Sequence, residues 1–132
     1  MRLWHVDIIA YLPKGQLLSQ WRELNSIFAK EDQHILINYI YEYPKDDLYR
    51  YTEKVIGEMK KRGYQIRAYE KMNKYFEDLG QVQHIQPFQH HHDKEYLEIC
   101  FYNLKEKFIR GQKDYEEEMY QQLCTYVNGV LK

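Results

Sequence analysis

The sequence is poor in the features that mark disulfide-rich, membrane-spanning or highly charged proteins. Its 132 residues include only two cysteines and three prolines, and no apolar run approaches the roughly 20 residues that a membrane-spanning helix needs. The formal net charge is −1, so the chain has no general electrostatic attraction to a polyanion. These absences exclude a disulfide scaffold and a transmembrane protein. Any binding of nucleic acid must depend on a local basic face.

The two cysteines, Cys100 and Cys124, fall at packing positions of expected helices. This placement favours buried, reduced thiols over a disulfide. The N-terminus has no secretory signal pattern, because Asp7 and Pro13 interrupt its apolar residues. We therefore expect a cytoplasmic protein that does not associate with membranes.

What the chain does have is the composition of a globular protein, with 44% hydrophobic and 30% charged residues. Its length suits a single domain over residues 1–132. The 14 tyrosines are unusual. Tyrosine packs its ring while its hydroxyl stays hydrated, so these residues favour half-buried helix faces or a contact surface. Residues 1–12 are apolar enough to pack against the rest of the fold.

Apolar periodicity, prolines and capping residues predict one compact all-α domain with three to four main helices. The first helix begins near Pro13, and the second opens just after Pro44 and ends before Gly63. The third and fourth are predicted over residues 93–108 and 114–131. Residues 71–79 are expected to form a short helix, residues 30–47 an extended or short helical connector, and residues 81–92 a loop.

A histidine cluster, His90, His91 and His92, precedes Asp93. Imidazole and carboxylate groups are both good zinc ligands. Consecutive histidines cannot all face one ion, however, and no further ligand stands at a suitable spacing. The favoured interpretation is a polar loop that leads to an Asp cap for the third helix. A metal-dependent hydrolase that uses this loop is a less favoured alternative.

The basic run Lys60, Lys61 and Arg62 allows two interpretations. Basic residues in the last turn of a helix complement its dipole, and the same residues can also grip phosphate groups. The sequence alone favours the first interpretation and leaves the second open.

A charged pair, Arg22 and Glu23, lies in the middle of the first helix. Adjacent helical residues diverge by about 100°, so these two do not pair with each other. A helical projection places them on opposite flanks of a buried stripe that includes Leu17, Trp21 and Leu24. Each can be partly shielded while its charged end reaches a groove.

Four segments carry a resemblance to a known family: "QLLSQWREL" at 16–24, "MRLWHVDIIAYLP" at 1–13, "MKKRGY" at 59–64 and "HHDKEYLEICFYNLKEK" at 91–107. They resemble the pyrimidine-dimer DNA glycosylase family, and its bacterial branch in particular. In the first segment the matching positions are Gln16, Leu17, Trp21, Arg22, Glu23 and Leu24. The resemblance implies an endonuclease V-like all-α fold and a DNA repair enzyme of base excision repair. It implies DNA glycosylase and abasic-site (AP) lyase activity on damaged double-stranded DNA, with no metal, no organic cofactor and no obligate protein partner.

The same resemblance implies roles for individual residues. In the family, the N-terminal α-amine attacks the sugar C1′ of the damaged nucleotide and forms a Schiff base. A terminal α-amine, with an ordinary pKa near 7.7–8.0, is about one-tenth neutral at pH 7, whereas a lysine amine is almost wholly charged. By position, Met1 would be the nucleophile, and Glu23 would stabilise the cationic sugar and move protons. DNA contacts are expected from Arg2, Arg22, Lys60, Lys61 and Arg62.

Two positions depart from the phage member of the family. Arg2 follows Met1, and so bulky a second residue should leave Met1 in place, which makes the Met1 amine itself the expected nucleophile. Ser26 stands where the phage enzyme has an arginine. Together with the near-neutral charge, these departures keep open a rival hypothesis from another class. It is a non-catalytic module that keeps the fold and binds a protein or nucleic acid through its tyrosine-rich surface.

Overall fold

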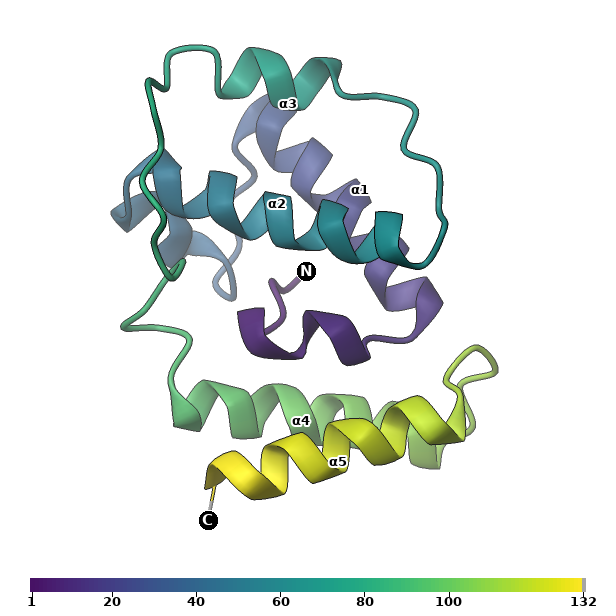
Figure 1. The fold of residues 1–132 in the computed structure, drawn as a ribbon. Helices are drawn as coiled ribbons and strands as arrows, with labels where there is room; N and C mark the ends of the chain where they lie inside the picture. Colours follow the sequence, from purple (N-terminus) through teal and green to yellow (C-terminus); the bar gives the residue numbers. More distant parts are fainter. Residues whose placement is uncertain (132) are drawn as a thin grey trace.

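A computed structural model describes residues 1–131, which form five α-helices and two 3₁₀ helices and contain no strand (Figure 1). In chain order they are η1 (Val6–Tyr11), α1 (Lys14–Lys30), η2 (Asn38–Glu42), α2 (Lys45–Lys61), α3 (Glu70–Tyr75), α4 (Lys94–Ile109) and α5 (Glu117–Leu131). Four of the helices are long and one is short. The all-α class expected from the sequence is confirmed, and the four long helices agree with the three to four main helices predicted.

Local sequence explains where the long helices begin and end. Pro13 and Pro44 occupy the N-cap positions of α1 and α2, where a missing N–H leaves no helical hydrogen bond unmade. Gly63, just past α2, has a φ of 84°, a conformation that glycine adopts without a Cβ clash. At the start of α4, the Asp93 side chain accepts a 2.9 Å hydrogen bond from the Tyr96 N–H. This contact confirms the predicted Asp cap.

The fourth long helix begins later than its sequence pattern indicates, at Glu117. Tertiary contacts hold the residues before it outside the helix. The Asp114 carboxylate accepts a hydrogen bond from the Gly15 N–H at the start of α1. Tyr115 is buried, and its hydroxyl donates to the Tyr11 carbonyl at 3.0 Å. These contacts join the start of α5 to η1 and α1 rather than extending α5.

The connecting segments also differ in detail from the prediction. The helix expected over residues 71–79 is α3, which ends at Tyr75, and part of the expected connector forms η2. Residues 81–92 contain no helix, as predicted. This loop still packs tightly, since Phe88 and His92 are both buried.

The helices form two groups around the N-terminal segment (Figure 1). α1 packs against α2 and α3, while α4 packs against α5. η1 contacts both α2 and α5 and so lies between the two groups. Leu3 and Ile8 are fully buried, and the start of the chain lies near the centre of the fold (Figure 1). The expectation that residues 1–12 are packed is therefore confirmed.

The described residues also bear on two expectations from the sequence, one about membrane-spanning helices and one about the cysteines. Within residues 1–131, no helix has both the length and the apolar character that crossing a bilayer requires. Cys100 is buried and Cys124 is half-buried, and both carry free thiols, as the sequence indicates.

Candidate active site at the N-terminus

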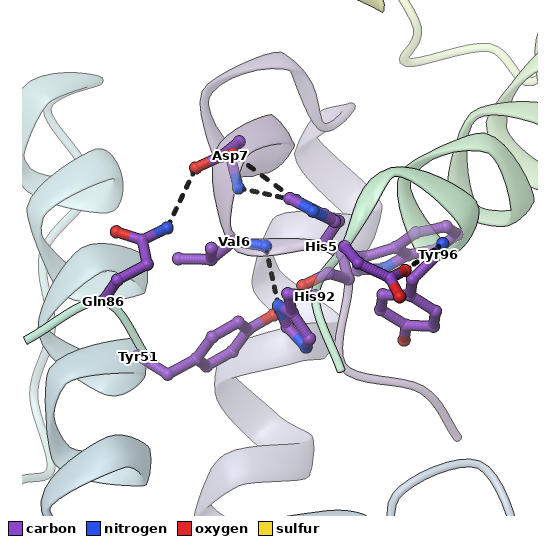
Figure 2. Close-up of polar contacts among 9 residues, drawn as sticks. His5, Val6, Asp7, Tyr51, Gln86, His92 and Tyr96 are labelled. Carbon is purple, nitrogen blue, oxygen red and sulfur yellow. Dashed lines mark hydrogen bonds and ion pairs between the residues drawn. The ribbon is translucent and has the colours of Figure 1, made fainter. Parts of the chain in front are cut away.

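Side chains from both helix groups hold the backbone of residues 2–6. They are Gln20 from α1, Tyr51 from α2, His92 from the loop before α4, and Tyr96 from α4. Figure 2 shows one of these contacts, the 3.0 Å hydrogen bond from the Val6 N–H to the His92 ring. The segment that leads to Met1 is therefore fixed in the interior rather than free to fray.

Gln20 provides the densest set of these contacts. Its side-chain oxygen accepts a 2.9 Å hydrogen bond from the Trp4 N–H and lies 2.8 Å from the Tyr51 hydroxyl, which donates to it. Its side-chain nitrogen donates to the Arg2 carbonyl at 3.1 Å and to the Glu23 carboxylate at 3.0 Å. The side chain is fully buried. Gln20 thus connects the start of the chain directly to Glu23.

Glu23 is half-buried on α1. Burial raises the pKa of its carboxyl above the ordinary value, because the charged form is less well solvated there. The positive charge of the chain's N-terminus opposes this rise most strongly, followed by the Arg2 N–H and the Arg22 side chain. The N-terminal ammonium group of Met1 therefore lies close enough to stabilise the ionised carboxylate. The structure links these two predicted groups through the charge of the terminus and through the Gln20 amide, which bonds both Glu23 and the carbonyl of Arg2.

The two arginines of the prediction face different surroundings. Arg22 is exposed on α1, and its guanidinium donates to the Ser19 hydroxyl at 2.9 Å. Arg2 is half-buried, and its guanidinium carbon lies 5.6 Å from the centre of the Tyr96 ring on α4. Arg22 is free to meet a phosphate, whereas Arg2 is already engaged with an aromatic face.

The three basic residues at the end of α2 also differ in their surroundings. Lys60 and Lys61 are exposed. Arg62 forms a 2.7 Å ion pair with Glu58 and donates to the Ala10 carbonyl at 3.1 Å. Arg62 therefore ties the end of α2 to η1, and the two lysines remain available to a polyanion.

A groove beside Arg22 contains residues that the sequence prediction missed. It has a volume of about 550 Å³ and is lined by Trp21, Arg22, Asn25, Ser26, Ala29, Lys30, Ala68, Glu70 and Lys71. Trp21, assigned to the buried stripe from its spacing, is only half-buried and meets Tyr69 edge to face at 6.2 Å. Gln20 was also missed, although a polar residue projected between Leu24 and Ile27 on an apolar face is a signal that can be read from the sequence.

Two of the loop histidines are held by protein contacts, since His91 stacks on the Tyr39 ring and His92 is hydrogen-bonded, whereas His90 is exposed. His92 accepts from the Val6 N–H at Nδ1, and its Nε2 lies 2.6 Å from the Tyr39 hydroxyl. Because Nδ1 accepts, the neutral ring carries its proton on Nε2. Burial, together with the smaller influence of His5 and His91, lowers the pKa of His92 to about 2. Among residues 1–131, no group of three or more His, Cys, Asp or Glu side chains is arranged to hold a metal ion. The loop thus offers no ligand set for the metal-dependent alternative.

Comparison with known protein families supplies the remaining observation. The family model described as pyrimidine dimer DNA glycosylase matches residues 1–72, more than half of the 132 residues. The chain belongs to the pyrimidine dimer DNA glycosylase family. No curated protein and no solved structure matches it.

Membership of the pyrimidine dimer DNA glycosylase family gives the protein a glycosylase-type role in DNA repair, with DNA as the substrate class. The matched region covers η1, α1, η2 and α2. It therefore contains Met1 and Glu23, as well as the basic residues expected to contact DNA.

Proposed function

We propose that the protein is a DNA glycosylase and abasic-site lyase that acts through the α-amine of Met1. The observation that supports this most directly is the environment of Glu23. A half-buried carboxylate with a raised pKa, influenced by the charge of the chain's own N-terminus, is suited to exchange protons with a reacting amine. The family match over residues 1–72 supports DNA as the substrate.

The proposed reaction begins with attack by the neutral Met1 amine on C1′ of the damaged nucleotide. A C1′–N bond forms, the glycosidic bond breaks, and the departing base takes a proton. Opening of the sugar ring then gives a Schiff base between C1′ and the amine. Loss of a C2′ proton expels the 3′ phosphate by β-elimination, and water finally releases the amine. Glu23 would stabilise the cationic intermediate and carry protons at the ring-opening and elimination steps.

DNA would be held by the exposed basic residues near this site. Arg22 and the lysines Lys60 and Lys61 are exposed, and Lys30 and Lys71 line the groove beside Arg22. Contacts from such residues to phosphate position a duplex without reading its sequence. A damaged duplex is easier to distort and unstack than an intact one, so selection for the lesion would come from deformability together with base contacts.

The test is incubation of the purified protein with abasic-site and dimer-containing duplexes in the presence of borohydride, which reduces a Schiff base to a stable amine. We expect a covalent protein–DNA complex and, without borohydride, strand cleavage on the 3′ side of the abasic site. A protein whose intact mass confirms a free Met1 amine, and which still gives neither product, would rule out the lyase.

A second candidate is the non-catalytic binding module. Ser26, which lines the groove, donates its hydroxyl to the Asp32 carboxylate, so a negative charge lies beside the expected DNA face. This placement favours weaker DNA affinity or another binding partner. The non-catalytic hypothesis predicts that acetylation of the Met1 amine leaves every measured property of the protein unchanged. The lyase hypothesis predicts that acetylation abolishes strand cleavage and borohydride trapping.

A further inference from the structure

We infer that Gln20 is a positioning residue that holds the Glu23 carboxylate and the start of the chain in one fixed arrangement. The inference rests on the proposed function, because it assigns a task to Gln20 within the same reaction. Gln20 does not touch the sugar in this scheme. It acts through Glu23 and through the peptide group of Arg2.

The orientation of the Gln20 amide is fixed by its four partners. Two of them, the Trp4 N–H and the Tyr51 hydroxyl, present hydrogens to its oxygen. The other two, the Arg2 carbonyl and the Glu23 carboxylate, present oxygens to its nitrogen. A flipped amide would turn its nitrogen towards the Trp4 N–H, which can only donate, and its oxygen towards the Arg2 carbonyl, which can only accept, so both of these hydrogen bonds would be lost. Only one orientation satisfies the site, and it aims a donor at Glu23.

The same nitrogen joins the two halves of the proposed site. One of its hydrogens goes to the carbonyl of Arg2, one residue beyond the nucleophile, and the other goes to the carboxylate of Glu23. Because Gln20 and Glu23 both belong to α1, movement of the N-terminal segment relative to α1 would break the bond to the Arg2 carbonyl. Reacting groups that are held in place before substrate arrives lose less entropy in the reaction.

The surroundings make this arrangement rigid. Gln20 is fully buried, and so is Tyr51, whose hydroxyl lies 2.8 Å from both the Gln20 oxygen and the Trp4 carbonyl and shares its one hydrogen between them. No buried side-chain polar atom of the described residues lacks a partner. A fully satisfied buried network of this kind specifies one conformation, whereas a partly satisfied one does not.

Loss of the Gln20 donor has a defined electrostatic consequence. The N-terminal ammonium and Arg22 act on Glu23 through their charges, the Arg2 backbone N–H acts through a hydrogen bond, and Tyr51 of α2 feels the charge of Glu23. Gln20 adds a hydrogen bond that favours the ionised carboxylate. Without that bond the carboxylate is less stabilised, so the pKa of Glu23 rises and a higher pH is needed to ionise it.

The experiment compares wild-type protein with Gln20→Met and Gln20→Glu. Gln20→Met keeps the length of the side chain and removes every hydrogen bond. Gln20→Glu keeps an acceptor for Trp4 and Tyr51 but replaces the donor to Glu23 with a second carboxyl. The readouts are single-turnover cleavage of an abasic-site duplex from pH 5 to 9, affinity for a tetrahydrofuran abasic analogue, and titration of the Glu23 carboxyl by NMR.

We expect both variants to move the Glu23 titration and the acid limb of the cleavage profile to higher pH. Cleavage near neutral pH should fall about tenfold to a hundredfold, the range expected when a reacting group is misplaced, while affinity for the analogue changes little. Thr52→Val is the matched control. Thr52 is fully buried, and the side-chain hydrogen bond that it makes among residues 1–131 goes to the Leu48 carbonyl within α2 at 2.7 Å, so this variant loses a buried hydrogen bond that involves neither Gln20 nor Glu23.

The outcomes separate the inference from the proposed function. Unchanged Glu23 titration in folded Gln20→Glu would overturn the inference, as would cleavage losses no larger than those of Thr52→Val. If Gln20→Met does not fold, Gln20→Glu alone decides. If the wild-type protein cleaves nothing, the proposed function fails. A shift of the Glu23 titration in the variants would still support Gln20 as the residue that positions this carboxylate.

Discussion

At the scale of single residues, the site depends on a carboxylate whose pKa is subject to two opposing influences. Burial raises the pKa of Glu23, and the nearby N-terminal charge opposes the rise. A group in this position can give up and take back a proton at a lower cost than a fully solvated carboxylate, whose pKa lies further below neutral pH. The adjacent residue Arg22 points instead to the surface. We therefore expect these two neighbours in the sequence to serve different tasks, Glu23 in chemistry and Arg22 in binding.

The residue-scale prediction concerns Glu23→Gln. The amide keeps the size of the side chain and can still accept from Gln20, but it cannot exchange a proton. We expect the single-turnover rate of strand cleavage to fall about a hundredfold or more, within the usual range for a lost acid–base group. Affinity for a tetrahydrofuran abasic analogue should change less than about threefold. Equal losses of cleavage and binding would instead assign Glu23 to DNA binding.

A second residue-scale prediction concerns Lys61, which is exposed at the end of α2. If its ammonium contacts a phosphate, Lys61→Ala should weaken binding to all duplexes about equally. It should also lower the slope of log affinity against log salt by about one. Thermal stability should change little, since the exposed Lys61 side chain contributes only the modest interaction of a last-turn cation with the helix dipole. A salt slope identical to that of the wild type would remove Lys61 from the interface.

At the scale of elements, the end of α2 and η1 are joined by one residue. The Arg62 and Glu58 side chains are each 13% exposed, and Arg62 also reaches the Ala10 carbonyl. A shielded, charge-assisted contact of this kind stabilises more than a surface pair does. Since η1 follows directly from the segment that carries Met1, this contact helps to hold the site in place.

We therefore predict that Arg62→Ala lowers the free energy of unfolding by about 2 kcal/mol, the typical contribution of a hydrogen bond to a charged group. Urea denaturation monitored by circular dichroism measures this change. Arg110→Ala is the matched control, because Arg110 pairs with Glu106 at 3.4 Å with both side chains largely exposed, and it should cost well under 1 kcal/mol. Equal effects of the two substitutions would refute the structural role of Arg62.

The sequence predicts elements better than it predicts the contacts between them. Proline, glycine and aspartate at helix ends act locally, so the bounds of α2 and the Asp93 cap could be predicted. The late start of α5 could not, because it depends on the contact of Asp114 with Gly15, about one hundred residues away in the chain. The burial of His92 was missed for the same reason, since its partners Val6 and Tyr39 lie far from it in the sequence. Glu23 was found by resemblance, while Gln20 was missed, although its projection onto the apolar face of α1 was a signal in the sequence and its contacts then showed its partners.

At the scale of the whole molecule, buried neutral histidines couple folding to pH. The pKa of His92 falls from an ordinary 6.5 to about 2 in the folded chain. Between these values the unfolded chain binds a proton that the folded chain excludes. The contribution of His92 is therefore fully present above pH 6.5 and is lost as the pH falls below it. Burial also lowers the pKa of His5, so the two histidines act in the same direction.

We predict that the free energy of unfolding decreases below pH 6.5 by about 1.4 kcal/mol per pH unit for His92, with a further contribution from His5. Denaturation series at pH 7.5, 6.5, 5.5 and 4.5 measure this slope. His92→Gln should make the slope shallower, although the protein will be less stable at pH 7.5. His84→Gln, in an exposed loop position, should leave the slope unchanged. A stability that is independent of pH between 4.5 and 6.5 would contradict the neutral, buried state of His92.

The most direct test of the whole account is the location of the trapped DNA adduct. The complex formed with an abasic-site duplex and borohydride is digested with a protease and a nuclease, and the modified peptide is sequenced by mass spectrometry. The account predicts a sugar remnant on the α-amine of Met1 and its absence from every lysine. An adduct on a lysine side chain, or no adduct from a protein with a free Met1 amine, would contradict it.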